Sequence, residues 1–401
     1  MRILDVNSSY SPSGGGIRVY HQRKLDYFAS SRSRHSSALA VPGTEDRLDT
    51  SGPGRVYHLK SIPLMNSGYR MLVDSGGINS VLLDYRPDIV EVGSPYLLPH
   101  LVRSAMGALE VPLVGFYHTD FPDSYVAPYA GMLFPRPIAS LFLGAARRHA
   151  SKVYGSMTAV FAASGCMLAK LRDLGVRRLF RTPLGVDAEL FSPSARSEDF
   201  RRSMGVPEGG ALVLYLARLH WEKGLDILME SYPLFRDPGR IRLVIGGRGP
   251  HSRLVDEFIS RYPEVRRLAF MKDRQAVATA MASSDVFLAL GRYETFGLAG
   301  LEAISCGTIP VFPDMGASAE MAASLDLLPA FSSKSPAGLA ESVLEAIDAS
   351  RQDHAAHLRE FAGAYTWESV FRRMEGYYEM ILDAFHEGHL DRLVPPGDWW
   401  E

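Results

Sequence analysis

Residues 285–312 read "DVFLALGRYETFGLAGLEAISCGTIPVF". The stretch opens on an apolar run at 285–290, passes through a polar loop at 291–296, continues as a helical pattern at 298–306 and closes on a second β-rich run at 308–312. Apolar residues on consecutive positions are typical of strands that are buried on both faces of a parallel sheet. The stretch therefore predicts a strand–helix–strand unit of an α/β fold.

The same alternation fills both halves of the chain. In the first half the pattern predicts strands at 2–6, 37–41, 55–59, 89–92, 112–117, 159–163 and 179–182, and helices at 17–29, 71–83, 97–109, 138–154 and 167–174. In the second half it predicts strands at 211–217, 241–246, 267–271, 285–290 and 308–312, and helices at 225–235, 252–260, 274–283, 298–306 and 337–349. Residues 183–193, "PLGVDAELFSP", interrupt the pattern with prolines and a glycine, which is typical of a linker.

These elements predict an α/β protein with two Rossmann-like, doubly wound domains that face a deep interdomain cleft. The expected boundaries are 1–187 for the first domain and 188–365 for the second. The tail, 366–401, contains a helical pattern at 367–385 with a wide apolar face that must pack on something. We expect this helix to pack back toward the N-terminal domain, and packing on the second domain alone is the alternative.

The composition is that of a folded protein without a strong overall charge. Of the 401 residues, 46% are apolar and 22% are charged, and 43 basic residues against 45 acidic ones give a formal net charge of −2. Such a balance provides no overall field to attract a nucleic acid. The two cysteines, Cys166 and Cys306, lie far apart, which fits a reducing cytoplasm better than a disulfide framework or a zinc site. No run approaches the roughly 18 apolar residues of a membrane span, and no export signal is expected.

Two glutamates and a glycine surround the expected helix start near 297. Glu294 precedes the helix, and Glu302 lies within it, about a turn and a half past Gly297. In an open parallel sheet, ligands bind where strands end and helices begin, because free N–H groups there attract anions. We interpret the carboxylates as two separate hydrogen-bond acceptors on either side of a phosphate, not as an acid–base pair. Helix capping alone would also explain the spacing.

Further candidates follow three other expected strands. Arg218 and Lys223, in "LARLHWEKGLD" at 216–226, are placed to neutralise phosphate charge, although a solvated basic turn has the same pattern. Three glycines, 14–16, would let the backbone approach a ligand or would form a flexible loop. His118, in "YHTDFP" at 117–122, would face a ligand or would be structural. The chain has no Asp-x-Asp pair, so no ligands for a metal-held diphosphate are evident.

Together these segments resemble the retaining glycosyltransferases of the GT-B architecture, in the group called family 4, or glycosyl transferases group 1. The resemblance covers nearly the whole chain. It rests on the glycines at 14–16, "YHTDFP", "PLGVDAELFSP", "ARLHWEKGLD", "VIGGRGP" at 244–250 and "ETFGLAGLEAISCGTIPV", whose two glutamates have the spacing of the family signature. Ala217 and Arg248 depart from the family pattern, and Arg248 leaves the choice of donor open.

The resemblance implies a hexosyltransferase that moves a hexose from a nucleotide diphosphate sugar, UDP-hexose or GDP-mannose, to a hydroxyl of a lipid, lipid-linked or polysaccharide acceptor. The product would have an α-linkage, and the leaving phosphate would help to deprotonate the acceptor. Neither a cofactor nor a metal is expected. A nucleotide-sugar epimerase or hydrolase on the same fold is the first alternative, and a dinucleotide-dependent oxidoreductase and a non-catalytic sugar-nucleotide sensor are the others.

The resemblance also implies a role for each matching residue. Arg218 and Lys223 would bind the diphosphate, Glu294 would hold donor-sugar hydroxyls and His118 would lie near the reacting carbon, and these four form the expected catalytic set. The other expected donor contacts are Glu302 at the ribose, the backbone of Phe296, Gly297 and Leu298, the loop at Met271 and Lys272 near the base, and Gly15 and Gly16 closing from the other domain.

A basic cluster in the first domain concerns the acceptor side. Arg147, Arg148, His149 and Lys152 follow the apolar run 138–143. An interfacial membrane patch and a solvated helix face with an apolar inner side both have this pattern. The sequence therefore predicts a cytoplasmic protein and leaves open peripheral contact with the inner face of the membrane.

Overall fold

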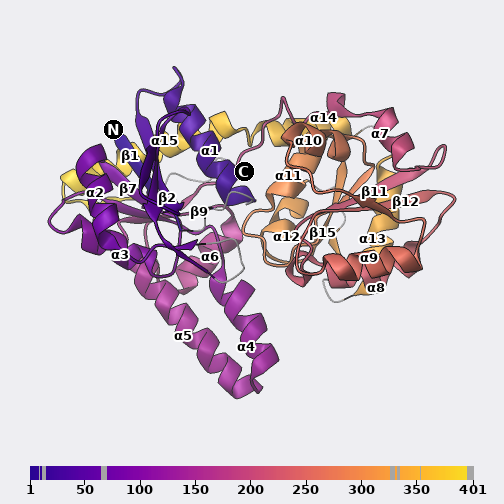
Figure 1. The fold of residues 1–401 in the computed structure, drawn as a ribbon, viewed down its shortest axis with the longest axis horizontal. Coiled ribbons are helices and arrows are strands. Elements are labelled where there is room, and N and C mark those ends of the chain that lie inside the picture. The colour runs from indigo at the N-terminus through magenta and orange to yellow at the C-terminus, as the bar shows by residue number, and fades with distance from the viewer. Residues whose placement is uncertain are drawn as a thin grey trace. The chain divides into compact units, whose positions relative to one another are not determined.

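The chain forms two compact units in a computed structural model, which describes residues 1–8, 10, 15–64, 70–325, 330–331, 335–352 and 354–394 (Figure 1). Unit 1 consists of Met1–Gly185 and Trp367–Glu401, and unit 2 of Val186–Thr366. Each unit is a Rossmann-like α/β structure around its own sheet, which confirms the predicted fold class.

The sheet of unit 1 has eight strands. In spatial order they are β10 (Leu179–Arg181), β9 (Ala159–Ala162), β8 (Leu113–Phe116), β7 (Ile89–Val92), β1 (Arg2–Val6), β2 (Ser36–Gly43), β4 (Arg55–Lys60) and β3 (Arg47–Asp49). All neighbours pair in parallel except β3, which is antiparallel to β4. The chain winds outward in both directions from β1, so the topological switch point lies between β1 and β7.

The remaining elements of unit 1 are mostly helices. They are α1 (Gly16–Ala29), α2 (Ser75–Tyr85), α3 (Leu98–Met106), the π-helical turn η1 (Pro122–Val126), α4 (Ala127–Leu133), α5 (Arg136–Gly155), α6 (Gly165–Asp173), α15 (Trp367–His386) and the 3₁₀ turn η4 (Leu390–Arg392), with a small antiparallel pair, β5 (Ile62–Pro63) and β6 (Arg70–Met71). Strands β8 and β9 are buried along their whole length, as their consecutive apolar residues predict, and β7 is equally buried although Glu91 interrupts its apolar residues.

The C-terminal helix α15 packs within unit 1. Its apolar face is Trp367, Val370, Phe371, Met374, Tyr377, Tyr378 and Ile381, all buried. The ring of Tyr378 lies 5.4 Å from that of Phe161 in β9, and Phe371 lies 5.6 Å from Tyr27 in α1. Because this spacing places all these side chains on one helix face, the sequence alone predicts both the helix and its burial.

The sheet of unit 2 has six strands. In spatial order they are β13 (Arg266–Leu268), β12 (Ile241–Gly246), β11 (Ala211–Leu216), β14 (Val286–Leu288), β15 (Ile309–Pro313) and β16 (Ala330–Phe331), and every pair is parallel. The winding reverses between β11 and β14, which makes this position the switch point of unit 2.

The helices of unit 2 follow the same winding. They are α7 (Glu198–Ser203), α8 (Leu225–Phe235), α9 (Ser252–Arg261), α10 (Arg274–Ala282), α11 (Leu298–Ser305), α12 (Gly316–Ala323), α13 (Pro336–Ala349) and α14 (Ala355–Gly363), with the 3₁₀ turns η2 (Pro193–Ala195) and η3 (Trp221–Lys223). Helix α13 packs with α8, and α14 packs with α11.

The chain passes from one unit to the other at 185–186 and at 366–367. On the unit 1 side, a Cβ added to Gly185 would lie 2.6 Å from the backbone nitrogen of Trp367. On the unit 2 side, the amide of Val186 donates to the carbonyl of Tyr365 at 2.7 Å. Because a side chain at 185 would occupy the space of the returning backbone, this position requires glycine.

Some predicted bounds were wrong. The helix expected at 71–83 begins at Ser75, because Asp74 accepts the amides of Gly76 and Gly77 and thereby caps it, and Met71 belongs to β6. The strand expected at 267–271 ends at Leu268. Helices α4, α7, α12 and α14 were not predicted.

Candidate functional site

The switch point of unit 2 brings together charged side chains from two loops. Arg218 and Lys223 lie on the segment that follows β11, and Glu294 lies on the segment that follows β14. Because β11 and β14 are parallel neighbours, both segments leave the same edge of the sheet. This edge is where an open α/β sheet binds its ligands.

Lys223 and Glu294 form an ion pair across the two loops. The Nζ atom of Lys223 donates to Oε1 of Glu294 at 2.6 Å, and about a third of each side chain is exposed. A Cβ added to Gly291 would lie 2.5 Å from the same carboxylate oxygen, so glycine at 291 leaves room for it. Since water reaches both charged groups, the pair can exchange one partner for a ligand without leaving a buried charge alone.

Arg218 also has an acidic partner. Its guanidinium donates to the carboxylate of Glu222, which is largely buried in the turn η3. Burial, together with the nearby Arg218, lowers the pKa of His220, whose side chain caps the same turn. Glu222 was not singled out from the sequence, although its position four residues after Arg218 is a signal for such a pair.

The loop after β11 is fixed against the loop after β14 by a glycine. Gly224 has a φ of +74°, and a Cβ at this position would lie 2.6 Å from the carbonyl oxygen of Leu290. Only glycine adopts this conformation at such a close approach without strain. The contact therefore sets the spacing between the cations and Glu294.

Helix α11 begins at the same edge. Gly297 precedes its first residue with a φ of +93°, a conformation that favours glycine. The first amides of a helix have no carbonyl partner within the helix, so the backbone at Gly297 and Leu298 presents donors and the positive end of the helix dipole. Phe296 is buried just before this turn. The arrangement suits an anion such as a phosphate.

Glu302 lies deeper in α11 and is buried. Its carboxylate accepts a hydrogen bond from Arg274, the first residue of α10, and the guanidinium of Arg274 lies 4.7 Å from the ring centroid of Phe191. Arg274 follows the loop that contains Met271 and Lys272. The sequence reasoning missed Arg274, because no local spacing links it to Glu302. The two expected donor segments, the α11 start and the loop at 271–272, are thus joined by this ion pair.

His118 lies in unit 1, just after β8. Its ring stacks on Phe116 with centroids 3.9 Å apart and lies edge-on to Tyr20 at 5.1 Å. Burial, and then repulsion from His21 and Lys24, lower the pKa of His118 well below its usual value of 6.5. The imidazole is therefore neutral at pH 7.

The expected glycine loop is described only in part. Gly14 lies outside the described residues, Gly15 caps α1 and Gly16 is its first residue. Within the part of the chain that the structure describes, no atom apart from those of its chain neighbours and its own helix backbone lies within 4 Å of a Cβ added to Gly15. The backbone here is open to approach, as the sequence predicts for a ligand-binding loop, but an open surface loop has the same geometry.

Unit 1 contains a buried charged network that the sequence reasoning missed. Lys24 of α1 donates to Asp5 at 2.6 Å, to Glu91 at 3.2 Å and to the hydroxyl of Tyr378 in α15 at 2.7 Å. Burial raises the pKa of Glu91; it would also raise that of Asp5, but Lys24 and His21 hold the pKa of Asp5 below its ordinary value. In the sequence, Lys24 lies four residues after Tyr20, which places both side chains on the same, buried face of α1, and this position was the signal for a buried lysine.

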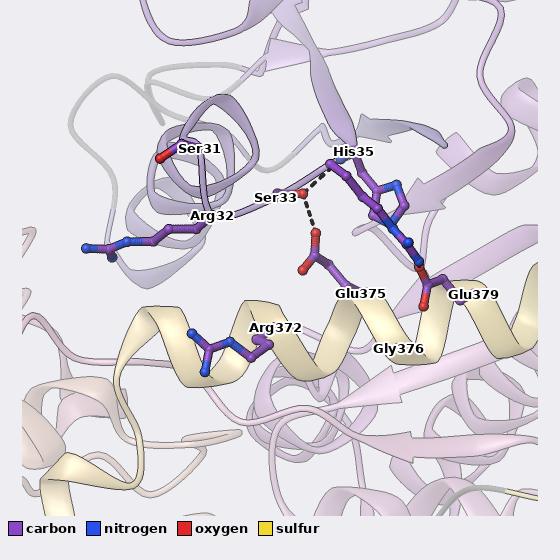
Figure 2. Close-up of a pocket in the computed structure, with 9 residues that line it drawn as sticks. Ser31, Arg32, Ser33, His35, Arg372, Glu375, Gly376 and Glu379 are labelled. Carbon is purple, nitrogen blue, oxygen red and sulfur yellow. Dashed lines mark hydrogen bonds and ion pairs between the residues drawn. The ribbon is translucent and has the colours of Figure 1, made fainter.

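A hollow of about 450 Å³ lies where α15 packs on the loop after α1 (Figure 2). Arg34 and His35 both pair with Glu379, at 2.7 and 3.0 Å, and the hydroxyl of Ser33 donates to Glu375. None of the residues predicted for the site lines this hollow. Its paired charges hold α15 to the loop, and they account for the hollow without a ligand.

Two doubly wound units, one of which has cations and a helix start at its switch point, form an arrangement that suits the binding of a phosphate-containing ligand. Residues 14–190 match the family described as Glycosyltransferase Family 4, and residues 196–363 match Glycosyl transferases group 1. A GDP-mannose-dependent alpha-(1-6)-phosphatidylinositol dimannoside mannosyltransferase of Mycobacterium tuberculosis is 30% identical over 380 residues, which cover 93% of this chain and 95% of the relative. A GDP-mannose-dependent alpha-mannosyltransferase of Corynebacterium glutamicum is 26% identical, with 95% and 89% covered.

Solved structures share the fold. Sucrose-phosphate synthase from Thermosynechococcus elongatus superposes with a TM-score of 0.76 at 16% identity and covers 96% of this chain and 100% of its own. Anabaena HepE in complex with UDP-glucose gives 0.72 at 18% identity, with 94% and 99% covered. The chain therefore belongs to the family 4, group 1 glycosyltransferases of the GT-B fold. It is a nucleotide-sugar glycosyltransferase of the hexosyltransferase type.

Proposed function

We propose that this enzyme transfers mannose from GDP-mannose to a hydroxyl group of a lipid or lipid-linked acceptor and forms an α-linkage with retention of configuration. The similarity that carries the proposal is to the mycobacterial relative, which is named for GDP-mannose and for a phosphatidylinositol dimannoside and aligns along nearly the whole chain. A UDP-hexose donor and a polysaccharide acceptor are the choices that the proposal sets aside.

The charged groups at the switch point of unit 2 support a donor that contains a diphosphate. In the proposed complex, Lys223 moves from Glu294 to the diphosphate, Arg218 binds the diphosphate while it keeps its pair with Glu222, and Glu294 accepts hydroxyl groups of the mannose. The amides at the start of α11 bind the phosphate, and Glu302 holds the ribose. Lys223 and Glu294 are both about a third exposed, so the ligand can replace this ion pair without leaving a buried charge alone.

The proposed reaction breaks the bond between the anomeric carbon and the diphosphate oxygen. A bond from the acceptor oxygen to the anomeric carbon forms on the same face, and the acceptor proton passes to the departing phosphate. Such a reaction requires stabilisation of the charge that develops on the leaving group, which Lys223 and Arg218 would supply without a metal. His118, neutral at pH 7, would donate or accept a hydrogen bond at the sugar and would not act as a cation.

A donor panel tests the proposal. The purified full chain is mixed with GDP, UDP, GDP-mannose and UDP-glucose, in EDTA and with added magnesium, and its melting temperature and donor hydrolysis are measured. GDP and GDP-mannose are expected to stabilise the fold by about 2.7 kcal/mol at a concentration 100 times Kd, with and without metal. Stabilisation by UDP alone would overturn the donor assignment, and binding only with magnesium would overturn the metal-free mechanism.

The anomeric configuration of the product completes the test. Transfer to a lipid-linked mannoside acceptor, followed by NMR of the anomeric proton, is expected to give an α-mannoside. A β-mannoside would contradict retention. Turnover of the donor to free mannose or to an epimer, with no transfer to any acceptor offered, would favour a hydrolase or an epimerase.

A further inference from the structure

The hairpin of α4 and α5 in unit 1 carries an unusual concentration of exposed apolar side chains. Within 18 positions the exposed large hydrophobic residues are Tyr125, Tyr129, Met132, Leu133, Phe134, Ile138, Leu141 and Phe142. Met132 and Leu141 are the most open, at 74% and 69% exposed. In Figure 1 the hairpin extends away from the rest of unit 1, with the turn between the helices at its tip. Exposed patches of this kind mark interaction surfaces.

The base of the hairpin is firmly attached to unit 1. Asp123, in the turn η1, pairs with Arg147 of α5 at 3.0 Å and with Lys170 of α6 at 2.8 Å. At the tip, the rings of Phe134 and Phe142 stack with centroids 5.0 Å apart. The hairpin is therefore an ordered projection whose apolar tip is exposed while its base is fixed.

The charge of the hairpin is opposite to that of the chain. Between Pro122 and Gly155 there are four basic residues, Arg136, Arg147, Arg148 and Lys152, and one acidic residue, Asp123, whereas the whole chain has a formal charge of −2. Arg148 and Lys152 are exposed. This local excess of positive charge complements an anionic surface.

The order of apolar and basic side chains along α5 matches the depth profile of a membrane interface. Leu141, Ala145, Arg148 and Lys152 are exposed and follow one another at spacings of four, three and four, so they share one helix face. With a rise of 1.5 Å per residue, Arg148 lies about 10 Å from Leu141 along the helix. Interfacial helices bury their apolar side chains roughly 5–10 Å deep, which would bring Arg148 to the level of the lipid phosphates.

We propose that the tip of the α4–α5 hairpin inserts into the interface of an anionic phospholipid bilayer, with Arg148 and Lys152 on the lipid headgroups. The proposal rests on the proposed function, because a lipid acceptor must be reached at a membrane. The turn η1, at the base of the hairpin, begins at Pro122, four residues after His118. Docking would therefore hold the segment that follows β8 close to the bilayer. Among the described residues, no helix is long and apolar enough to cross a membrane.

Vesicle flotation of the full chain tests the proposal. Wild-type protein is expected to float with vesicles of phosphatidylcholine and phosphatidylglycerol, to remain free with phosphatidylcholine alone and to dissociate as salt rises. The double variant Leu133→Ser/Leu141→Ser is expected to lose vesicle affinity at least about tenfold, and Arg148→Glu/Lys152→Glu at least about tenfold. Leu83→Ser is the matched control, since Leu83 lies on α2 of the same unit, is 68% exposed and should leave flotation unchanged.

The remaining outcomes either contradict the docking proposal or distinguish it from the function proposed above. Unchanged flotation of the tip variant, or equal flotation with neutral vesicles, would contradict docking by this hairpin. A wild-type dimer in sedimentation velocity that the tip substitutions dissociate, with no flotation, would show that the tip binds a second copy instead. GDP binding by each variant is measured in parallel. Flotation without GDP binding would refute the proposed donor and leave the docking proposal intact. GDP binding without flotation would refute the docking proposal and leave the donor assignment intact.

Discussion

The two units each pair a lysine with carboxylate oxygens, but in opposite surroundings. Lys24 in unit 1 is fully buried and contacts Asp5, Glu91 and a tyrosine hydroxyl, whereas Lys223 in unit 2 is 31% exposed and pairs with Glu294. A buried charge must keep its partners, because losing one leaves an uncompensated charge in a medium of low polarity. A half-exposed charge can exchange its partner for a ligand. Exposure of the side chain, more than its charge, therefore distinguishes the structural lysine from the candidate ligand-binding lysine.

The largest effect should follow from breaking the buried network. Lys24→Met leaves Asp5 and Glu91 facing each other in the core, and the free energy of unfolding should fall by about 3–5 kcal/mol in urea denaturation. Gln22→Met, at a neighbouring exposed position on α1, is the control and should change stability by less than about 0.5 kcal/mol. If the two variants are equally stable, the network does not support unit 1 as described.

The next effect tests the half-exposed pair. Lys223→Met should lower turnover by about 100- to 1,000-fold, because one charge that stabilises the departing diphosphate is lost, while the melting temperature stays close to that of the wild type. Arg253→Met removes another ion-paired cation of unit 2, at an exposed position on α9, and should keep full activity. Large destabilisation with normal activity per folded molecule would make Lys223 a structural residue like Lys24.

A smaller effect is expected from Arg274, which positions Glu302. Arg274→Ala should raise KM for the donor by about tenfold and leave kcat nearly unchanged, because in the proposed complex Glu302 holds the ribose, away from the reacting carbon. Arg274→Lys should restore part of the affinity. A fall in kcat at constant KM would indicate that this pair acts at the reaction centre and would contradict the positioning role.

The smallest effect concerns pH. The pKa of His118 lies below its value in the unfolded chain, so unfolding takes up a proton as pH falls through 6.5, and the stabilising contribution of the neutral ring is lost below that pH. The stability difference between wild type and His118→Asn should therefore shrink by about 1 kcal/mol between pH 6.5 and 5.5. A difference that stays constant over this range would mean that His118 titrates normally.

The sequence predicts the fold well where local pattern and burial agree. Fully buried strands such as β9 (Ala159–Ala162) are continuous apolar runs, and α15 has an unbroken helical spacing. Helix α12 was missed because "GASAEMAA" consists of small residues without an apolar period. The start of α2 was misplaced because apolar residues continue ahead of the helix, and the capping by Asp74, not the apolar pattern, sets its first turn.

The position of the site was predictable from the ends of the strands and from the glycines that follow them. Gly297 and Lys223 lie at the switch-point edge because each directly follows a recognisable strand and loop. The ion-pair partners of the site residues were not predictable. Pairs such as Arg274 with Glu302 join residues on different helices that are 28 positions apart in sequence. The network of Lys24 was out of reach for the same reason, since it joins α1 to two strands and to the last helix. The roles of the site residues in binding and transfer stay predictions.

The most direct test of the central claim, that the switch point of unit 2 holds the nucleotide diphosphate, is a calorimetric titration of GDP. Wild-type protein and Arg236→Met, which removes an exposed ion pair elsewhere in unit 2, should bind GDP with equal affinity. Lys223→Met should bind at least about tenfold more weakly, which corresponds to about 1.4 kcal/mol. Equal affinity of all three proteins for GDP would contradict the claim.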